Sequence, residues 1–257
     1  MKFYGKTDVG SVRHENQDCY GIFELRKGMT LCIVCDGMGG AAGGALASNL
    51  AMETFAYAIR DNILPDYPDE QQNLTPASVK YALSAALNAA NAEVLRVADE
   101  NESGSLDGMG TTLVALLIVE DVGAFCINVG DSRLYDVTNK EMIQVTKDHS
   151  YVQHLIDIGK LTYEQAKTSP VRNVITRAVG ADDTVKADVY SVPLYLPDVQ
   201  KRYFLLCTDG LTGCVGENSI FAMMNTPRSL DQKADALVKA ANAAGGPDNI
   251  TVLLVEL

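Results

Sequence analysis

The hydrophobic residues of this 257-residue chain gather in short runs and in longer periodic segments, and the two kinds come in blocks. Short runs rich in β-branched and aromatic residues are typical of strands. They predict a first block of strands at 3–9, 19–25 and 29–35, a second at 112–119, 124–129, 134–137 and 142–145, and later strands at 185–192, 203–207 and 250–255. Because the turns within the second block are short and polar, we expect antiparallel hairpins there.

Longer segments between these blocks have the composition, spacing and end signals of helices. The segment 41–60 opens in a glycine-rich turn, and 76–99 begins with Thr75 as N-cap and Pro76 at its first position. A third helix, 230–243, has apolar residues at helical spacing and stops at Gly245-Gly246-Pro247. Shorter helices are expected at 150–158 and 162–167, a break at 64–70 and an irregular stretch at 169–181.

Strands and helices in blocks, without strict alternation, predict an α+β fold with packed sheets and helices outside. No segment is long enough or rich enough in glycine and serine to act as a linker, so we expect one domain over residues 1–257.

The charge balance limits the partners. The chain has 33 acidic and 21 basic residues, for a formal charge of −12. It therefore has no overall positive field to attract nucleic acid or an anionic membrane. The longest aliphatic run, 113–119, is too short to cross a bilayer, and the first five residues do not resemble a secretory signal. We expect a cytoplasmic monomer.

The six cysteines do not predict a disulfide framework. Cys32 and Cys35 form a CxxC pair, but they lie in a predicted strand, where residues three apart point to opposite faces. Neither a second CxxC nor paired histidines are present to complete a zinc site. We therefore interpret the cysteines as small buried hydrophobic residues in a reducing compartment.

Five aspartates stand at the ends of predicted strands. Asp36 and Asp209 each follow an apolar run and begin a D-G-x-x-G sequence. Asp131 follows another strand, and Asp18 and Asp248 precede strands. An Asp-Gly pair after a strand is by itself also what a simple turn needs. If the five carboxylates converge at one end of the sheets, however, their repulsion calls for cations, and a set of oxygen ligands without His or Cys points to Mg²⁺ or Mn²⁺.

Arg13, five residues before Asp18, adds a group that binds tetrahedral anions. Cations together with an arginine, and no nucleophilic Ser or Cys motif, suggest attack of metal-bound water on a phosphoryl group. The glycine-rich run 37–44 can be read as a phosphate-binding loop or as a tight strand-to-helix turn. Because it lacks the Lys-Ser/Thr ending of a P-loop, we favour the turn.

Taken in order along the chain, these motifs resemble the metal-dependent protein serine/threonine phosphatases of type 2C, in particular the bacterial members. The matching motifs are Val12-Arg13, Asn16-Gln17-Asp18, Asp36-Gly37-Met38-Gly39-Gly40, Gly110-Thr111-Thr112, Gly130-Asp131-Ser132-Arg133, Asn173-Val174-Ile175-Thr176-Arg177, Thr208-Asp209-Gly210-Leu211 and Gly246-Pro247-Asp248-Asn249-Ile250-Thr251. The resemblance implies a central sandwich of two antiparallel sheets flanked by helices on both sides, with the metal site at one edge. It also implies a mobile flap at about 149–180 (the flap segment), which borders the active site and influences substrate choice.

The resemblance also assigns roles residue by residue. Asp36 bridges two catalytic Mn²⁺ or Mg²⁺ ions, and the carbonyl of Gly37 joins one of them. Asp209 and Asp248 bind the other ion, and Arg13 binds the substrate phosphate. Asp18 belongs to the metal site through waters. Asp131, together with Asp209, matches the position of a third, weaker ion.

Two positions depart from the pattern of animal members. Gln17 stands where a Glu touches metal-bound water, and Met38 stands where a His is proposed to protonate the leaving group. The general acid is therefore open between His14 and water on the third ion. Arg133 is interpreted as a structural ion-pair partner, and Arg177 either recognises phosphopeptide or is a solvated surface residue.

These expectations converge on a phosphatase that removes phosphate from phosphoserine and phosphothreonine in proteins by attack of a metal-bridged water or hydroxide. Phosphorylated proteins are then its partners, together with a cognate serine/threonine kinase. Two rivals remain open: a non-catalytic relative that binds metal or phosphoprotein, and a two-metal phosphoesterase for small phosphates or nucleic acid. The full set of Asp36, Asp209, Asp248 and Arg13 argues against the first, and the net charge of −12 argues against a polyanionic substrate in the second.

Overall fold

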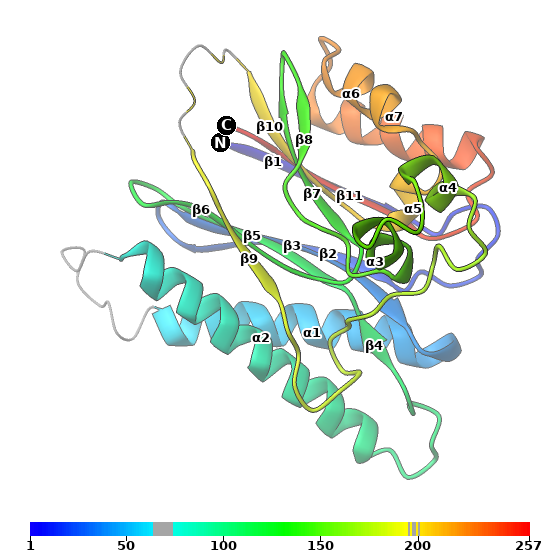
Figure 1. The fold of residues 1–257 in the computed structure, drawn as a ribbon. Helices are drawn as coiled ribbons and strands as arrows, with labels where there is room; N and C mark the ends of the chain where they lie inside the picture. The colour runs from blue at the N-terminus through cyan, green and yellow to red at the C-terminus, as the bar shows by residue number, and fades with distance from the viewer. Residues whose placement is uncertain (64–73, 195, 197–198, 200) are drawn as a thin grey trace.

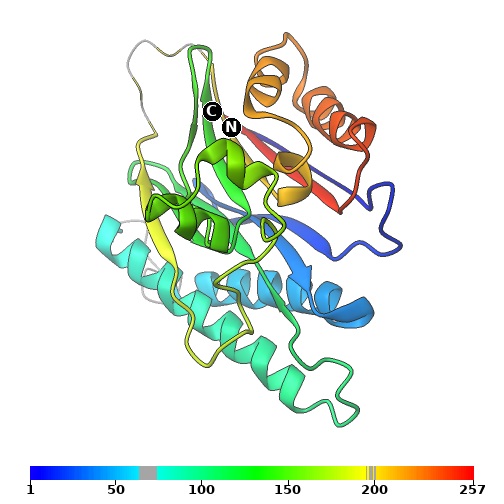
Figure 2. The same ribbon diagram turned by 45° about the vertical axis from the view of Figure 1, so that its right-hand side comes forward.

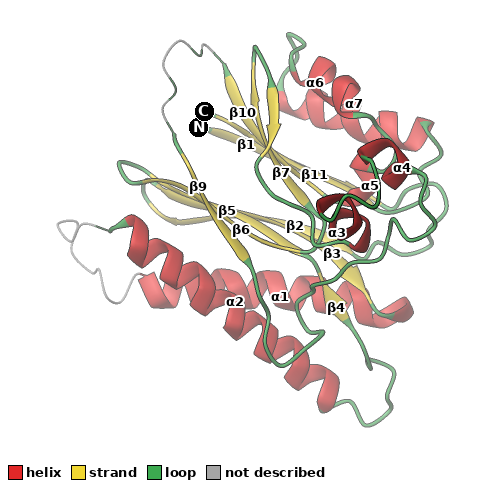
Figure 3. Cartoon of the chain, in the orientation of Figure 1, coloured by secondary structure: helices red, strands yellow, loops and turns green. Residues whose placement is uncertain are grey.

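Two stacked β-sheets form the centre of the molecule, and helices cover both outer faces (Figures 1 and 3). The computed structural model describes residues 1–63, 74–194, 196, 199 and 201–257. The predicted break at 64–70 lies outside these residues. Every strand pairing among the described residues is antiparallel, as the short polar turns predict.

The first sheet has five strands in the order β1-β11-β10-β7-β8, and so the first and last strands of the chain lie side by side in it. The register pairs Lys2 with Glu256 and Asp8 with Ile250. The strands are β1 (Lys2–Asp8), β7 (Arg133–Thr138), β8 (Met142–Gln144), β10 (Arg202–Cys207) and β11 (Ile250–Glu256).

The second sheet follows the order β2-β3-β5-β6-β9, and the short β4 pairs with the end of β3. Pairing with β4 extends β3 through Met38, three residues beyond the predicted end at 35. The strands are β2 (Asp18–Arg26), β3 (Met29–Met38), β4 (Gly110–Thr111), β5 (Leu113–Val119), β6 (Gly123–Val129) and β9 (Asp188–Val192).

Two long helices, α1 (Gly40–Ile63) and α2 (Pro76–Asp99), cover the second sheet. On the other side α5 (Asp209–Thr212), α6 (Glu217–Met224) and α7 (Leu230–Ala243) cover the first sheet. The ends of α2 and α7 match the sequence prediction, and the hydroxyl of Thr75 accepts a hydrogen bond from the backbone of Ser78 as the N-cap.

Apolar side chains fill three layers: one between the two sheets, and one between each sheet and its helices. Strand β3 contributes side chains to two of these layers, because its alternate residues point to opposite faces of the sheet. Cys32 lies between the sheets and Cys35 lies against the helices, and all six cysteines are free. The prediction that the CxxC thiols diverge is confirmed.

The flap segment crosses one end of the sandwich (Figure 2). It contains α3 (Tyr151–Asp157) and α4 (Tyr163–Lys167), with Ser150 and Thr162 as their N-caps. Within the described ranges, the structure contains no helix long and apolar enough to span a membrane.

Candidate metal and phosphate site

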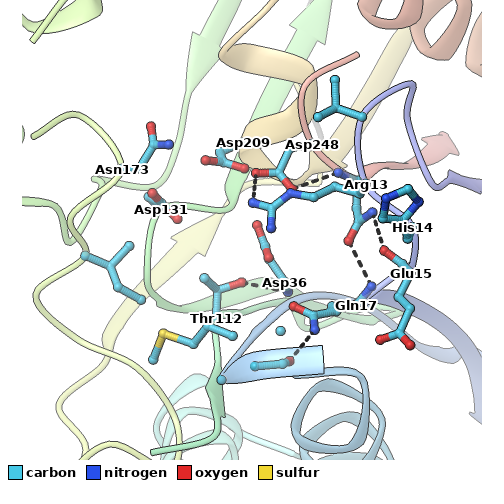
Figure 4. Close-up of a pocket in the computed structure, with 17 residues that line it drawn as sticks. Arg13, His14, Glu15, Gln17, Asp36, Thr112, Asp131, Asn173, Asp209 and Asp248 are labelled. Atoms are coloured by element: carbon cyan, nitrogen blue, oxygen red, sulfur yellow. Dashed lines mark hydrogen bonds and ion pairs between the residues drawn. The ribbon is translucent and has the colours of Figure 1, made fainter. Parts of the chain in front are cut away.

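A cavity of about 660 Å³ opens at the end of the sandwich next to the flap segment. Its walls come from the loop after β1, the end of β3, the loop after β6, the start of α5, the loop before β11, and the flap segment. Asp36, Asp131, Asp209, Asp248 and Arg13 all line it (Figure 4). Residues that lie more than 230 positions apart in the chain therefore meet in one cavity, as Arg13 and Asp248 do at a separation of 235.

Asp36 and Asp18 lie opposite each other on β3 and β2, so their side chains are on the same face of the sheet. The backbone N–H of Asp36 donates to the hydroxyl of Thr112 at 3.0 Å. Asp18 is buried behind the cavity, where its Oδ2 accepts from the hydroxyls of Thr208 at 2.8 Å and Thr251 at 2.7 Å. Its other oxygen, Oδ1, is buried without a hydrogen-bond partner.

Two of the D-G motifs differ from a simple turn. Asp36 is inside β3, two residues before its end, and Asp209 is the first residue of α5 after the N-cap Thr208. Asp131 directly follows the tight bend at Gly130, and Asp248 stands two residues before β11. The structure thus brings all four carboxylates to the cavity from separate elements.

Crowding and burial make these carboxylates costly to ionise. Burial and the neighbouring aspartates raise the pKa of Asp36 and of Asp131 well above the usual range, and raise that of Asp209 as well. Burial raises the pKa of Asp18 to about 7. A site that favours protonated carboxylates at neutral pH also favours a bound cation that neutralises them.

Arg13 reaches into the cavity from the loop between β1 and β2, and its Nη2 donates to Oδ2 of Asp248 at 2.9 Å. Asn249 fixes this loop. Its side-chain oxygen accepts from the backbone N–H of Gln17 at 2.9 Å, and its amide donates to the carbonyl of Glu15 at 2.9 Å. The guanidinium is half exposed and has five N–H groups, so it can contact Asp248 and a phosphate together.

The glycine-rich run is a strand-to-helix turn, as we favoured. Strand β3 ends at Met38 and α1 begins at Gly40. A Cβ on Gly37 would lie 2.0 Å from the carbonyl oxygen of Gly44, and so only glycine lets the strand pass this close to the helix. Gln17 closes the same turn by donating from Nε2 to the carbonyl of Gly40 at 2.6 Å.

Of the other candidate residues, some line the cavity and some form ion pairs outside it. Met38 and His14 both line it, and His14 lies beside Arg13 and Glu15 at its rim. Arg133 forms a two-pronged ion pair with Asp148, which confirms its structural interpretation.

Arg177 forms an ion pair with Asp188 at 3.2 Å. It is therefore tied to β9 while its side chain remains 38% exposed at the surface, and recognition of phosphopeptide by Arg177 stays a prediction.

Several supporting residues had no role in the sequence analysis. They are hydroxyl or amide side chains that hold the aspartates or their loops: Thr112, Ser132, Thr208, Asn249 and Thr251. Each stands within three residues of a strand-end aspartate or in a glycine-rich motif, which is the signal that the sequence offered.

The donor set fits hard divalent cations. It consists of carboxylates and a glycine carbonyl, and the unpaired Oδ1 of Asp18 has no protein donor to satisfy it. In the described parts of the chain, no three Asp, Glu, His or Cys side chains lie close enough together to hold a metal ion by themselves. Mg²⁺-like ions are typically held by one or two carboxylates and several waters, which requires no such cage.

Comparison with known proteins identifies the family of this chain. The family model "Protein phosphatase 2C" matches residues 11–254. The "Serine/threonine phosphatase stp" of Listeria monocytogenes is 37% identical over 251 residues, which cover 98% of this chain and 94% of the relative.

Solved structures agree as well. The serine/threonine phosphatase of S. agalactiae superposes with a TM-score of 0.85 at 30% identity, covering 98% of each chain. The catalytic domain of the phosphatase PstP, solved with two manganese ions, gives a TM-score of 0.74 at 30% identity, covering 98% of this chain and 96% of that one.

The fold and the acidic cavity define a phosphatase of the metal-dependent class. The chain belongs to the protein phosphatase 2C family. It is a serine/threonine protein phosphatase that acts on phosphoproteins, and its family is metal-dependent.

Proposed function

We propose that the chain hydrolyses phosphoserine and phosphothreonine at the cavity between Arg13 and the aspartates, without a covalent enzyme intermediate. The observation that supports this is the meeting of four carboxylates and one guanidinium in a single cavity, with no nucleophilic Ser or Cys among the residues that line it. A pair of divalent cations would supply an activated water and would stabilise the charge that develops on the phosphoryl group.

Each proposed metal ion has its own set of protein ligands. Asp36 and the Gly37 carbonyl would hold one ion, and Asp36, Asp209 and Asp248 would hold the second. Asp18 would act through waters, from which its unpaired buried Oδ1 is placed to accept. Asp131, with Asp209, would hold a third and weaker ion. The ions are Mn²⁺ or Mg²⁺, and the manganese bound to the related PstP domain supports Mn²⁺.

Arg13 orients the substrate phosphate. It approaches the cavity from the side of Asp248, and this carboxylate holds the guanidinium in place before substrate arrives. Two parallel N–H donors on phosphate oxygens would fix the phosphorus for in-line attack.

The proposal also covers the flap segment, the compartment and the partners of the protein. The flap segment of this single domain borders the cavity through Asn173 and Ile175, and so it is placed to touch the protein around the phosphorylated residue. The six free thiols suit a reducing cytoplasm. We propose a monomer whose phosphoprotein partners include a cognate serine/threonine kinase.

Phosphate release from a phosphothreonine peptide tests the reaction. We expect turnover with Mn²⁺, none with EDTA, and a loss of at least about a hundredfold in Asp36→Asn. Asp99→Asn, the same change at an exposed helix residue, is the matched control and should retain activity. A wild-type protein without metal-dependent turnover would support the non-catalytic rival, and turnover restricted to small phosphates or nucleic acid would support the other.

Arg13→Ala tests the phosphate role separately. Loss of a charge-assisted pair of hydrogen bonds costs about 1.5–3 kcal/mol, so the KM for phosphopeptide should rise by about 10- to 100-fold. An unchanged KM would remove Arg13 from phosphate binding.

A further inference from the structure

His149, the first residue of the flap segment, is buried and has no part in the site described above. Its backbone joins three parts of the chain. Its N–H donates to the carbonyl of Gly130 at 2.9 Å, and its own carbonyl accepts from Thr176 at 2.7 Å. The next residue, Ser150, forms an isolated β-bridge with Ile175. Both ends of the flap segment therefore meet at His149.

The imidazole ring makes a second, independent connection. Its Nδ1 accepts the backbone N–H of Gly130 at 3.1 Å, so Nδ1 carries a lone pair and the proton of the neutral ring lies on Nε2. Nε2 faces Oδ2 of Asp188 at 3.3 Å, which accepts that proton. Nη1 of Arg177 lies 3.0 Å from Nε2 and could donate to it only if Nε2 were unprotonated. With the proton on Nε2, Nη1 donates to the other oxygen of Asp188, Oδ1, at 3.2 Å.

The neutral ring is consistent with its surroundings. Burial lowers the pKa of His149 below the usual value, and the positive charge of Arg177 adds to this effect. A protonated ring would place an N–H at Nδ1 directly against the N–H of Gly130. The Gly130 contact therefore requires the Nε2–H tautomer of the neutral side chain. The Arg177 contact with Nε2 would require the other tautomer, but Arg177 also has Oδ1 of Asp188 as an acceptor.

Gly130 transmits this contact to the cavity. Its φ is +101°, and a Cβ there would lie 2.5 Å from Cγ2 of Thr112. Thr112 in turn contacts the hydroxyl of Ser132 at 2.7 Å and accepts the N–H of Asp36 at 3.0 Å. The bend that carries Asp131 is therefore held between Thr112 on one side and His149 on the other (Figure 4 shows Asp131 and Thr112).

We propose that His149 is a positioning residue, which through its Nε2–H tautomer holds the Gly130 amide and thereby sets the Asp131 carboxylate relative to Asp36. The same residue anchors the flap segment, so the base of the flap and the Asp131 bend form one hydrogen-bonded unit. The inference rests on the proposed function only where it treats Asp131 as a cation ligand.

The tautomer is tested on the metal-free wild-type protein by ¹⁵N NMR of the histidine rings at pH 7.5. We expect an unprotonated, pyridine-like Nδ1 and a protonated Nε2 for His149, with a coupling between the Gly130 N–H and Nδ1. A protonated Nδ1, or a ring that is charged at this pH, would overturn the proposal.

Two variants then separate the two ring contacts. Asn at position 149 places an acceptor near the place of Nδ1, whereas Gln reaches the place of Nε2. His149→Asn should therefore keep the Gly130 contact and lose that with Asp188, and His149→Gln should do the reverse. His154→Asn, on the exposed face of α3, is the matched control.

Calorimetric titration with Mn²⁺ gives the readout, with Asp131→Ala identifying the weak site. We expect His149→Gln to weaken that site by about tenfold, as loss of a group that orients a ligand typically does. His149→Asn and His154→Asn should keep wild-type affinity, and the tighter sites should stay unchanged in all three. Equal losses in the Asn and Gln variants, or no loss in the Gln variant, would overturn the proposal.

Failure of the proposed function has a different signature. A wild-type protein that binds no Mn²⁺ refutes the metal site itself. The NMR measurements of the ring tautomer and of the Gly130 N–H need no metal. They therefore still test whether His149 holds the bend at Gly130.

Discussion

Replacement of the buried carboxylate Asp18 measures how much its ionisation destabilises the metal-free folded protein. The pKa of Asp18 is about 7 against an ordinary value of 3.8, mainly because it is buried. Between these two values the folded protein holds a proton that the unfolded chain has released. Folded stability therefore falls as the pH rises from about 4 to about 7, and the loss is complete above that window.

The size of this effect follows from the two pKa values. Each tenfold change in proton affinity corresponds to 1.36 kcal/mol, so ionised Asp18 costs the metal-free fold up to about 4 kcal/mol at pH 8. Asp18→Asn removes the ionisation, while its side-chain oxygen still accepts from Thr208 and Thr251. In EDTA at pH 8 we expect the variant to be more stable than wild type by a few kcal/mol.

Urea unfolding in EDTA, repeated from pH 4 to pH 8, measures the difference. The stabilities of the two proteins should approach each other towards pH 4, where Asp18 is protonated in the folded protein and only partly ionised in the unfolded chain. With millimolar Mn²⁺ the advantage of the variant should shrink or reverse, because a bound cation stabilises the folded wild type.

Glu102→Gln, which neutralises an exposed carboxylate, should change stability by less than about 0.5 kcal/mol at every pH. The reasoning is refuted if Asp18→Asn is no more stable than wild type at pH 8 in EDTA, or if the gap between them does not change with pH.

Three other substitutions test separate features of the structure. Gly37→Ala places a Cβ 2.0 Å from a backbone oxygen, so it should abolish Mn²⁺ binding by calorimetry, whereas Gly216→Ala, with open space around it, should bind normally. Asp136→Ala leaves the buried Arg202 without its ion-pair partner and should cost about 3–5 kcal/mol in urea unfolding; a loss below 1 kcal/mol would contradict this. Thr112→Val removes the acceptor of a buried backbone N–H, so it should cost about 1–3 kcal/mol in urea unfolding and lower kcat, while Thr112→Ser should restore both.

Local signals explain which parts of the fold were predictable. The helix at Pro76–Asp99 was predicted to the residue, because Thr75 and Pro76 mark its start within the chain itself. The end of β3 was placed too early, because its last residues are strand only through pairing with Gly110 and Thr111. The four-residue α5 was missed, since a single turn of helix has no periodicity to detect.

The candidate site was likewise predictable only in part from the sequence. The aspartates were found because each stands beside an apolar run, a property visible in the sequence. The role of Thr112 was not visible, because its contact with Asp36 spans 76 positions and exists only after the sheets assemble. The role of His149 was not visible either, because its neighbours Gly130 and Asp188 are likewise brought to it by the fold.

The pairing of β11 between β1 and β10 has a consequence for how the enzyme is made. Asp248, Asn249 and Thr251 are translated more than 225 residues after Arg13 and Asp18, yet they complete the same cavity. A nascent chain that has not yet released β11 from the ribosome lacks the strand between β1 and β10 and the Asp248 contact of Arg13, and with them one of the carboxylates that we propose to bind metal. We therefore expect the nascent phosphatase to be inactive until β11 pairs with β1 and β10. A product shortened by a premature stop before β11 should then not act on phosphoproteins.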